Sequence, residues 1–241
     1  MVEPQTRRIA AGLIACITLG AATPALAHPD EAPSLAYCEA FPLHEESFKG
    51  REKPIALPAE WAAFAKSSLN WIAYKTEQGA TLCDDISWID EGTGFERFND
   101  SFVGYEWTAY EAWGYTLVDL SGRGQILETG AKPMFAPSGQ RFAAIQLSEA
   151  GWGGFEGFGV WNTWGGGLNP IQIDTSLPQL QDWRIDRWEG DECLHLSAVP
   201  WERLEGDWEN LPNVERDQYV AGDANGWEIT AGDTCPSYDA P

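Results

Sequence analysis

Carboxylates are the commonest side chains in this sequence that could perform acid–base chemistry. The chain holds 37 Asp and Glu residues, among them the adjacent pairs Asp84-Asp85 and Asp90-Glu91. Two carboxyl groups can catalyse glycoside hydrolysis when their separation is suitable and one of them keeps a raised pKa. In a chain so rich in acids, however, adjacent pairs arise from composition alone, and solvated turns account for them. The pairs therefore predict no catalytic centre.

Histidine, the usual general base, is scarce. A Ser-His-Asp triad would have to use His44 or His195, yet the sequence contains no G-x-S-x-G elbow. His195 alternates with Leu194 and Leu196, which predicts a strand with the histidine on the face opposite the leucines. Residues 223–228 hold only some of the oxygen ligands of a calcium loop, so a plain turn is expected there. We expect a non-enzymatic protein with no catalytic residue, no metal site and no cofactor.

The segment 151–167, GWGGFEGFGVWNTWGGG, combines aromatic rings with eight glycines. Sugars stack on exposed tryptophan faces, so Trp152, Phe155, Trp161 and Trp164 are the candidate binding residues. The competing interpretation is a twisted hairpin whose rings pack into a β core while the glycines permit tight turns. Exposure of the three tryptophans along one face would favour carbohydrate binding, and burial of all three would exclude it.

Cysteine usage points to an oxidising compartment. Of the five cysteines, Cys16 lies in the N-terminal apolar run, which leaves Cys38, Cys83, Cys193 and Cys235. An even number predicts two disulfides, for which three connectivities exist. We expect Cys38 to pair with Cys83 and Cys193 with Cys235, because each bond would then fasten one end of the chain to the nearest structure. No two of the four have the C-x-x-C spacing typical of a zinc site.

The N-terminus has the order of a secretory signal peptide over residues 1–27. Arg7-Arg8 precede an apolar run from 9 to 22, and Ala25-Leu26-Ala27 form the small-residue cleavage site. The run is too short for a membrane-spanning helix. We predict cleavage near Ala27 and a periplasmic or secreted protein without a membrane span. Lipidation at Cys16 is the alternative, but the residues after it stay apolar where a lipoprotein turns polar.

The charge of the chain narrows its partners. The formal net charge is −22, and removal of residues 1–27, with one acid and two arginines, makes it −23. Such a surface repels phosphate backbones and anionic headgroups, which argues against nucleic acid and membrane surfaces as partners. Solubility is a sufficient reason for the charge. Attraction to a basic partner protein is the more specific hypothesis.

The chain divides into a leader and a single domain. Residues 28–57 form an extended leader, and 58–241 a β-rich domain that begins with a helix over 58–75, where apolar residues have near-helical spacing. After Gly79, short β-favouring runs alternate with turn residues, and the short connections favour antiparallel neighbours. The predicted strands cover residues 82–89, 102–112, 115–120, 125–129, 141–147 and 157–161.

Two motifs in the middle of the chain carry a family resemblance. Phe135-Ala136-Pro137-Ser138-Gly139-Gln140-Arg141-Phe142-Ala143 and Val160-Trp161-Asn162-Thr163 resemble a blade of the WD or Tol-B type of β-propeller, with a weaker copy over 188–196. The layout is similar to that of small exported bacterial proteins that keep a blade or two. The resemblance implies strand-turn-strand geometry and no chemistry. Ring closure takes at least ~4 blades of four strands, and this chain is expected to be too short for it.

The predicted fold is therefore mainly β, an antiparallel propeller-blade-like meander or open sandwich with one N-terminal helix and two disulfides. The predicted function is a non-enzymatic exported binding module whose ligand is a protein or a glycan of the cell envelope. An acidic periplasmic inhibitor of a basic hydrolase such as lysozyme, a carbohydrate-binding domain and a structural envelope factor are the alternatives.

Overall fold

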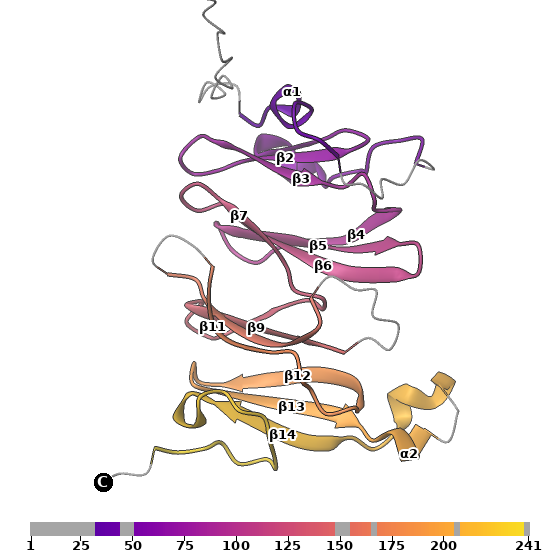
Figure 1. Ribbon diagram of the computed structural model, residues 1–241. Coiled ribbons are helices and arrows are strands. Elements are labelled where there is room, and N and C mark those ends of the chain that lie inside the picture. Colours follow the sequence, from indigo (N-terminus) through magenta and orange to yellow (C-terminus); the bar gives the residue numbers. More distant parts are fainter. Residues whose placement is uncertain (1–31, 44–50, 148–154, 165–167, 205–207, 239–241) are drawn as a thin grey trace, which may run out of the picture.

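The computed structural model describes residues 32–43, 51–147, 155–164, 168–204 and 208–238. The predicted signal peptide, Cys16 and His44 lie outside these ranges. Within them, four antiparallel sheets stack face to face, in chain order from the N-terminal to the C-terminal end of the molecule (Figure 1). We call them the first to the fourth sheet.

Each sheet is a meander in which consecutive strands are hydrogen-bonded neighbours. The first sheet has the strands β1 (Ala65–Ser67), β2 (Trp71–Lys75) and β3 (Thr81–Asp85). The second has β4 (Glu91–Arg97), β5 (Phe102–Ala109), β6 (Ala112–Asp119) and β7 (Gln125–Glu128). The third has β8 (Met134–Phe135), β9 (Arg141–Gln146), β10 (Gly157–Asn162) and β11 (Asn169–Asp174). The fourth has β12 (Gln181–Glu189), β13 (Cys193–Val199), β14 (Asp217–Gly222) and β15 (Thr230–Ala231).

Helical structure in the described part of the chain is limited to short segments between or before the strands. The α-helices are α1 (Leu35–Cys38) and α2 (Trp201–Leu204). The 3₁₀ segments are Ala59–Ala63, Trp208–Asn213 and Asp223–Asn225. Among the described residues, no helix has the length and apolarity needed to cross a membrane.

The mainly-β, antiparallel, blade-like fold is confirmed. The described residues build four blade-like sheets, more than the one or two blades of the proteins whose layout the sequence resembles. Strands as short as two residues and tight turns let a sheet recur about every forty residues, the usual length of one blade. The stack stays open, because the first and fourth sheets lie at its opposite ends (Figure 1).

The predicted helix over 58–75 is wrong beyond its first turn. Residues Ala59–Ala63 form one 3₁₀ segment, and β1 and β2 follow it. The chain reverses between them, where the Ser68 N–H donates to the Trp71 carbonyl at 2.8 Å and the Trp71 N–H to the Ser68 Oγ at 3.2 Å. The near-helical spacing did not predict the structure, because β2 has hydrogen-bonded neighbours on both sides. This sheet pairing outweighs the local preference of the segment for a helix. α1, in turn, lies inside the region expected to be extended.

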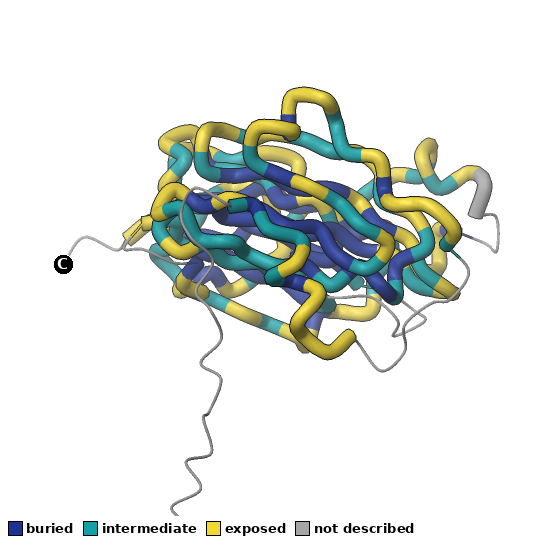
Figure 2. Tube along the Cα trace, turned by 90° about the horizontal axis from the view of Figure 1, so that it is seen from above, coloured by how far each residue is buried: buried dark blue, intermediate teal, exposed yellow. Residues whose placement is uncertain are grey.

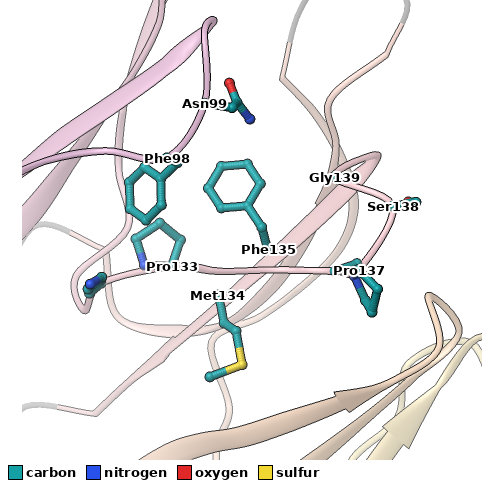
Figure 3. Close-up of a pocket in the computed structure, with 10 residues that line it drawn as sticks. Phe98, Asn99, Pro133, Met134, Phe135, Pro137, Ser138 and Gly139 are labelled. Carbon is teal, nitrogen blue, oxygen red and sulfur yellow. The ribbon is translucent and has the colours of Figure 1, made fainter.

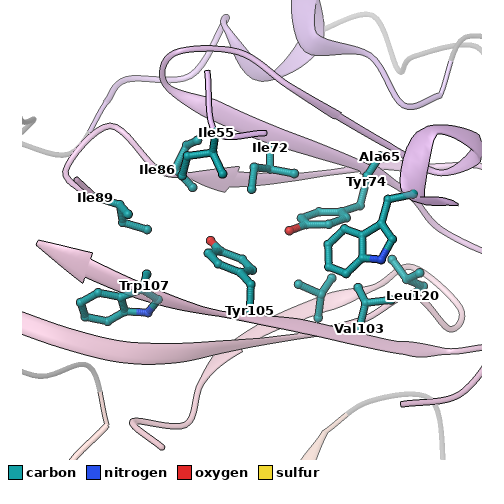
Figure 4. Packing of buried hydrophobic residues seen from close by; sticks show 12 residues of the cluster. Ile55, Ala65, Ile72, Tyr74, Ile86, Ile89, Val103, Tyr105, Trp107 and Leu120 are labelled. Carbon is teal, nitrogen blue, oxygen red and sulfur yellow. The ribbon is translucent and has the colours of Figure 1, made fainter. Parts of the chain in front are cut away.

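Each interface between sheets has its own apolar core. Ile72, Tyr74, Val103 and Tyr105 belong to the cluster between the first and second sheets (Figure 4). The interface of the second and third sheets is centred on aromatic rings, and that of the third and fourth on leucines and tryptophans. Seen along the stack, buried strands fill the centre and exposed turns form the rim (Figure 2).

The two outer faces of the stack are covered by terminal segments that disulfides hold in place. Cys38 of α1 is bonded to Cys83 of β3, and Cys193 of β13 to Cys235 near the C-terminus, so both predicted pairings are confirmed. In a closed ring the first and last sheets would pack on each other. In this open stack, the terminal segments provide the covering that capping repeats give to other repeat folds.

Candidate functional site

A groove of about 710 Å³ crosses the edge strand β8 of the third sheet. We call it the β8 groove (Figure 3). It is lined by Phe98, Asn99, Lys132, Pro133, Met134, Phe135, Ala136, Pro137, Ser138 and Gly139. These residues come from the β4–β5 turn of the second sheet and from the segment that leads into and out of β8.

Local sequence chemistry builds both sides of the β8 groove. In the β4–β5 turn, the Asn99 Oδ1 accepts hydrogen bonds from the N–H groups of Ser101 and Phe102, each at 2.9 Å. In the β8–β9 turn, the Gly139 N–H donates to the Ala136 carbonyl at 2.8 Å, and Gly139 has the positive φ of 71° that glycine tolerates. The strand-turn-strand geometry expected from the blade motif is therefore present, and its turn forms part of the groove.

Aromatic packing makes one wall of the groove rigid. The rings of Phe98 and Phe135 pack at an interplanar angle of 40° with centroids 4.9 Å apart, and Phe135 also packs against Phe102 at 5.2 Å and Phe142 at 5.4 Å. Met134 points to the other side of β8 (Figure 3) and is half-buried. The groove therefore offers phenylalanine and proline surfaces on one side of β8 and the Met134 side chain on the other.

Charged groups surround this apolar surface. The Lys132 ammonium group is paired with Glu96 and lies 5.8 Å from the centre of the Phe98 ring. Asp100 is fully exposed beside Asn99 and is paired with Arg97 at 3.2 Å, and Asp191 accepts a hydrogen bond from the Ser138 N–H at 3.1 Å. Carboxylates thus flank the groove at both its second-sheet and its fourth-sheet end.

The edge strand itself is poorly suited to pair with an added strand. β8 has two residues, and Pro133 and Pro137 stand on either side of it. Proline donates no backbone hydrogen bond, and prolines at sheet edges oppose strand addition. The Met134 carbonyl moreover accepts a hydrogen bond from the Trp188 Nε1 at 3.0 Å. The groove is therefore a site for side chains rather than a site for β-strand addition.

The structure distributes the aromatic residues proposed for binding over different environments. Trp161 is buried and stacks on Phe142 at 5.1 Å with an interplanar angle of 11°, and Phe155 meets the Trp161 ring edge-on at 5.5 Å. Trp164 is 62% exposed, and Trp152 lies outside the described residues. Of the three described rings, two therefore pack in the core between the second and third sheets.

Asp84 is the most strongly perturbed acid that the structure describes. It lies in strand β3 rather than in a solvated turn, and its Oδ2 accepts a 2.7 Å hydrogen bond from the Tyr105 hydroxyl. Burial raises the pKa of its carboxyl to about 7, although the hydrogen bond from Tyr105 acts in the opposite direction. Because it is enclosed by the core of the first two sheets, we assign it a structural role.

One polar cluster was missed because its members are far apart in sequence. His195 lies opposite the core leucines of β13, as the alternation predicts, and its Nε2 is 3.5 Å from the Cys235 Sγ. The same nitrogen is 2.8 Å from the Glu189 Oε2 and 3.2 Å from the Arg187 Nη2. Cys193, two residues before His195, shares its strand face. The two-residue spacing of Cys193 and His195 could have indicated that they lie close together. The approach of Cys235 is visible only in the tertiary structure.

The three ligand atoms of Cys193, His195 and Cys235 lie within 4.8 Å of one another, as in a metal site. Both cysteines are joined in the disulfide, so neither offers a thiolate to a metal in this state. Residues Asp223–Asn225 form the expected turn. There, Asp223 is engaged by the Arg141 guanidinium at 3.3 Å.

No protein-family model matches this chain, and no curated protein matches it in sequence. Several solved structures resemble it in part, among them two from proteases. The β-propeller domain of the Trilobed protease from Pyrococcus furiosus, described as having an open velcro topology, is 13% identical with a TM-score of 0.31, over 61% of this chain and 43% of that one. The tricorn protease is 15% identical with a TM-score of 0.29, over 78% and 18%. The chain thus spans less than half the length of either protein.

Proposed function

We propose that the protein is a non-enzymatic interaction module of an oxidising compartment outside the cytoplasm, and that it binds a basic protein partner at the β8 groove. The observation that carries the proposal is the groove itself, an apolar surface of Phe98, Met134 and Phe135 flanked by the carboxylates of Asp100 and Asp191. Apolar pockets with a few placed polar groups are the usual form of a binding site.

The partner's chemistry follows from the charge around the groove. The chain carries a formal charge of −22, so a basic partner is attracted at long range and an acidic one is repelled. One apolar or aromatic side chain of the partner would enter the groove between Lys132 and Pro137, and its neighbouring Lys or Arg residues would meet Asp100 and Asp191. A basic hydrolase such as lysozyme is one partner of this class, and inhibition would follow if the contact covered its active site.

The two disulfides support the compartment. Disulfides persist in oxidising environments such as the periplasm and the extracellular space, and they are rare in the cytosol. The N-terminal sequence adds the order of a signal peptide, which directs a chain to those same environments. Export with cleavage near Ala27 is accordingly part of the proposal, and sequencing of the N-terminus of the protein purified from its host tests it.

Met134 offers a direct test of binding, because the chain has two methionines and Met1 belongs to the predicted signal peptide. Protein labelled with ¹³C at the methionine methyl groups is titrated with a short lysine-rich peptide that carries one central phenylalanine. We expect the Met134 methyl resonance to shift and saturate, and the affinity to fall as salt rises. A glutamate-rich peptide with the same phenylalanine is expected to leave the resonance unchanged.

Isosteric changes of the flanking acids provide the matched variants. The double change Asp100→Asn and Asp191→Asn is expected to weaken binding of the basic peptide several-fold, because it removes charge and keeps shape. Glu60→Gln, at an exposed position of the first sheet's 3₁₀ segment, is the control and is expected to change nothing. If the Met134 resonance does not respond to the basic peptide or to lysozyme at low salt, the groove is not the binding site.

A glycan is the second candidate ligand, and the exposure of Trp164 is the observation that favours it. A single exposed ring can stack on one sugar unit, although Trp161 and Phe155 are packed too closely with other rings to extend the platform. Titration with envelope glycan fragments, monitored by tryptophan fluorescence in the wild type and in Trp164→Ala, tests this candidate. A response that persists in Trp164→Ala would remove it.

A further inference from the structure

The two disulfides of this chain have different surroundings. The Cys38–Cys83 bond packs in a small apolar cluster with Trp71. The Cys193–Cys235 bond lies on the outer face of the fourth sheet beside polar and charged side chains. Their loops are nearly equal, with sequence separations of 45 and 42, so loop entropy does not distinguish them.

An imidazole and a cluster of charged side chains stand next to one sulfur of the second bond. The His195 Nε2 lies 3.5 Å from the Cys235 Sγ, and the Arg187 Nη2 lies 3.2 Å from the same nitrogen. Glu189 holds the imidazole from a third side at 2.8 Å. Arginine keeps its charge at all physiological pH values, and a nearby cation favours the thiolate form of cysteine. These contacts would stabilise the reduced state of this pair.

The two sulfurs differ in access. Cys193 is 4% exposed within β13, whereas Cys235 is half-buried in the segment 232–238, whose other residues are mostly exposed. An incoming thiolate can therefore reach the Cys235 sulfur, while the Cys193 sulfur is shielded by the sheet. A reachable sulfur near Arg187 and His195, bonded to a shielded partner, gives an incoming thiolate one preferred point of attack.

We propose that Cys193–Cys235 is a thiol–disulfide exchange site that reacts with dithiol reductants. A reductant thiolate attacks the Cys235 Sγ; the sulfur–sulfur bond breaks, and its electron pair passes to the Cys193 Sγ, which takes up a proton. The second thiolate of the reductant then attacks the reductant's other sulfur, which is bonded to Cys235 in the mixed disulfide. Cys235 is released as a thiolate beside His195 and Arg187. The protein disulfide is reduced by two electrons, and the dithiol is oxidised to a disulfide.

Reduction would change the outer face of the fourth sheet. The disulfide holds residues 232–238 there, and Pro236 lies so close to Gly222 that a Cβ on that glycine would be 2.8 Å from the proline Cγ. Once the bond is open, the C-terminal segment keeps this packing and the 2.9 Å hydrogen bond from the Gly232 N–H to the Gln218 carbonyl, but it loses its covalent link to β13. The exchange site thus controls whether this face, including His195 and Val220, is covered.

Graded mixtures of reduced and oxidised dithiothreitol test the proposal on the full chain. After equilibration, free thiols are alkylated and each cysteine is quantified by mass spectrometry. We expect Cys193–Cys235 to reach half-reduction at a reduced-to-oxidised ratio at least tenfold lower than Cys38–Cys83, and the trapped mixed disulfide to be on Cys235. Equal half-reduction ratios for the two bonds would overturn the proposal.

Variants separate thiolate stabilisation from simple access. Arg187→Ala and His195→Gln are expected to raise the ratio of reduced to oxidised dithiothreitol needed for half-reduction of Cys193–Cys235, because they remove groups that stabilise the thiolate. Access alone would change the rate of exchange and leave this equilibrium ratio unchanged. Arg184→Ala, on the same strand but away from the sulfur, is the control. Arg187 is exposed, so its variant keeps the test valid if His195→Gln does not fold. Unchanged half-reduction ratios in both variants would overturn the proposal. Stoichiometric Zn²⁺ uptake by the reduced protein, if it depends on His195, would also overturn it, because it would identify a metal site.

Discussion

The Tyr105 hydroxyl donates a 2.7 Å hydrogen bond to the Asp84 carboxylate across the interface of the first and second sheets. This places an ionisable pair in a core that is otherwise composed of apolar and aromatic side chains (Figure 4). Burial has the largest effect on the pKa of Asp84. It favours the neutral carboxyl, because a buried carboxylate would lose the hydration of its charge. The cohesion of these two sheets is therefore coupled to the protonation of one aspartate.

This coupling predicts how stability depends on pH. The pKa of Asp84 rises from an ordinary 3.8 to about 7 in the folded protein, so the folded state binds the proton more tightly than the unfolded state does. The stabilisation is fully present below pH 4 and is lost as the pH rises through 7, a change of about 4 kcal/mol. Urea unfolding of the wild type and of Asp84→Asn between pH 4 and 8 measures it.

The Asn variant is expected to lose most of this pH dependence and to be more stable than the wild type at pH 8. Other acids also repel one another as the pH rises, so the quantity of interest is the difference in slope between the two proteins. Asp100→Asn changes the net charge equally at an exposed position and serves as the control. If Asp84→Asn and Asp100→Asn give the same slope, Asp84 is not the group responsible.

The sequence pattern predicts those strands in which apolar and polar residues alternate, or which consist of a continuous apolar segment. β5, β6, β7, β9 and β10 lie within three residues of their predicted bounds. β4 was missed because its sequence, EGTGFER, is mostly exposed and contains two glycines. It forms because β5 offers it hydrogen-bonding partners, with an irregular register between Thr93 and Glu96 and Gly94 at a φ of 57°. Such a strand depends on its neighbour and has little signal of its own.

Glycine at position 159 is predicted to be required by ring packing rather than by its backbone conformation. A Cβ at Gly159 would lie 2.1 Å from the Trp161 Cη2, and the ring could move only by losing its stacking on Phe142. Gly159→Ala is therefore expected to cost about 1–3 kcal/mol of unfolding free energy from overpacking. Gly139→Ala, where φ is 71° but the space is open, is expected to cost about 1 kcal/mol. A loss for Gly159→Ala smaller than that for Gly139→Ala in urea unfolding would contradict the ring-packing explanation.

The β8 groove could not be predicted from the sequence. Its residues come from two turns more than thirty positions apart, and their approach is set by how closely the second and third sheets pack. The turn at Pro137 was recognised, but only as architecture. The aromatic segment was recognised as well, yet the pattern of rings and glycines does not reveal which rings face inward. Gly159 leaves room for Trp161 to fold back onto its own strand, a contact that needs coordinates.

Two arginines that share one carboxylate are predicted to differ in importance. Arg216 is paired with Asp182 at 2.6 Å, is 17% exposed, and also donates to the Ser197 hydroxyl and carbonyl at 2.9 and 3.1 Å. Arg184 pairs with the same aspartate but is 50% exposed. Arg216→Ala is expected to cost about 2–3 kcal/mol of unfolding free energy, because it leaves buried hydrogen-bond acceptors without their donor. Arg184→Ala is expected to cost less than about 1 kcal/mol. Thermal and urea unfolding of the two variants give the comparison.

α1 and its disulfide cover the outer face of the first sheet. Cys38–Cys83 holds α1 against Trp71 and Ala73, and the Ser34 N–H donates to the Thr81 Oγ1 at 3.1 Å. Replacement of both cysteines by serine frees a loop of 45 residues in the unfolded chain, which corresponds to about 4 kcal/mol of lost stability in the chain-entropy model. Hydrogen exchange is expected to rise first in α1 and β3, while the fourth sheet keeps its protection. Uniform loss of protection across all four sheets would show instead that the bond stabilises the whole stack rather than its N-terminal end.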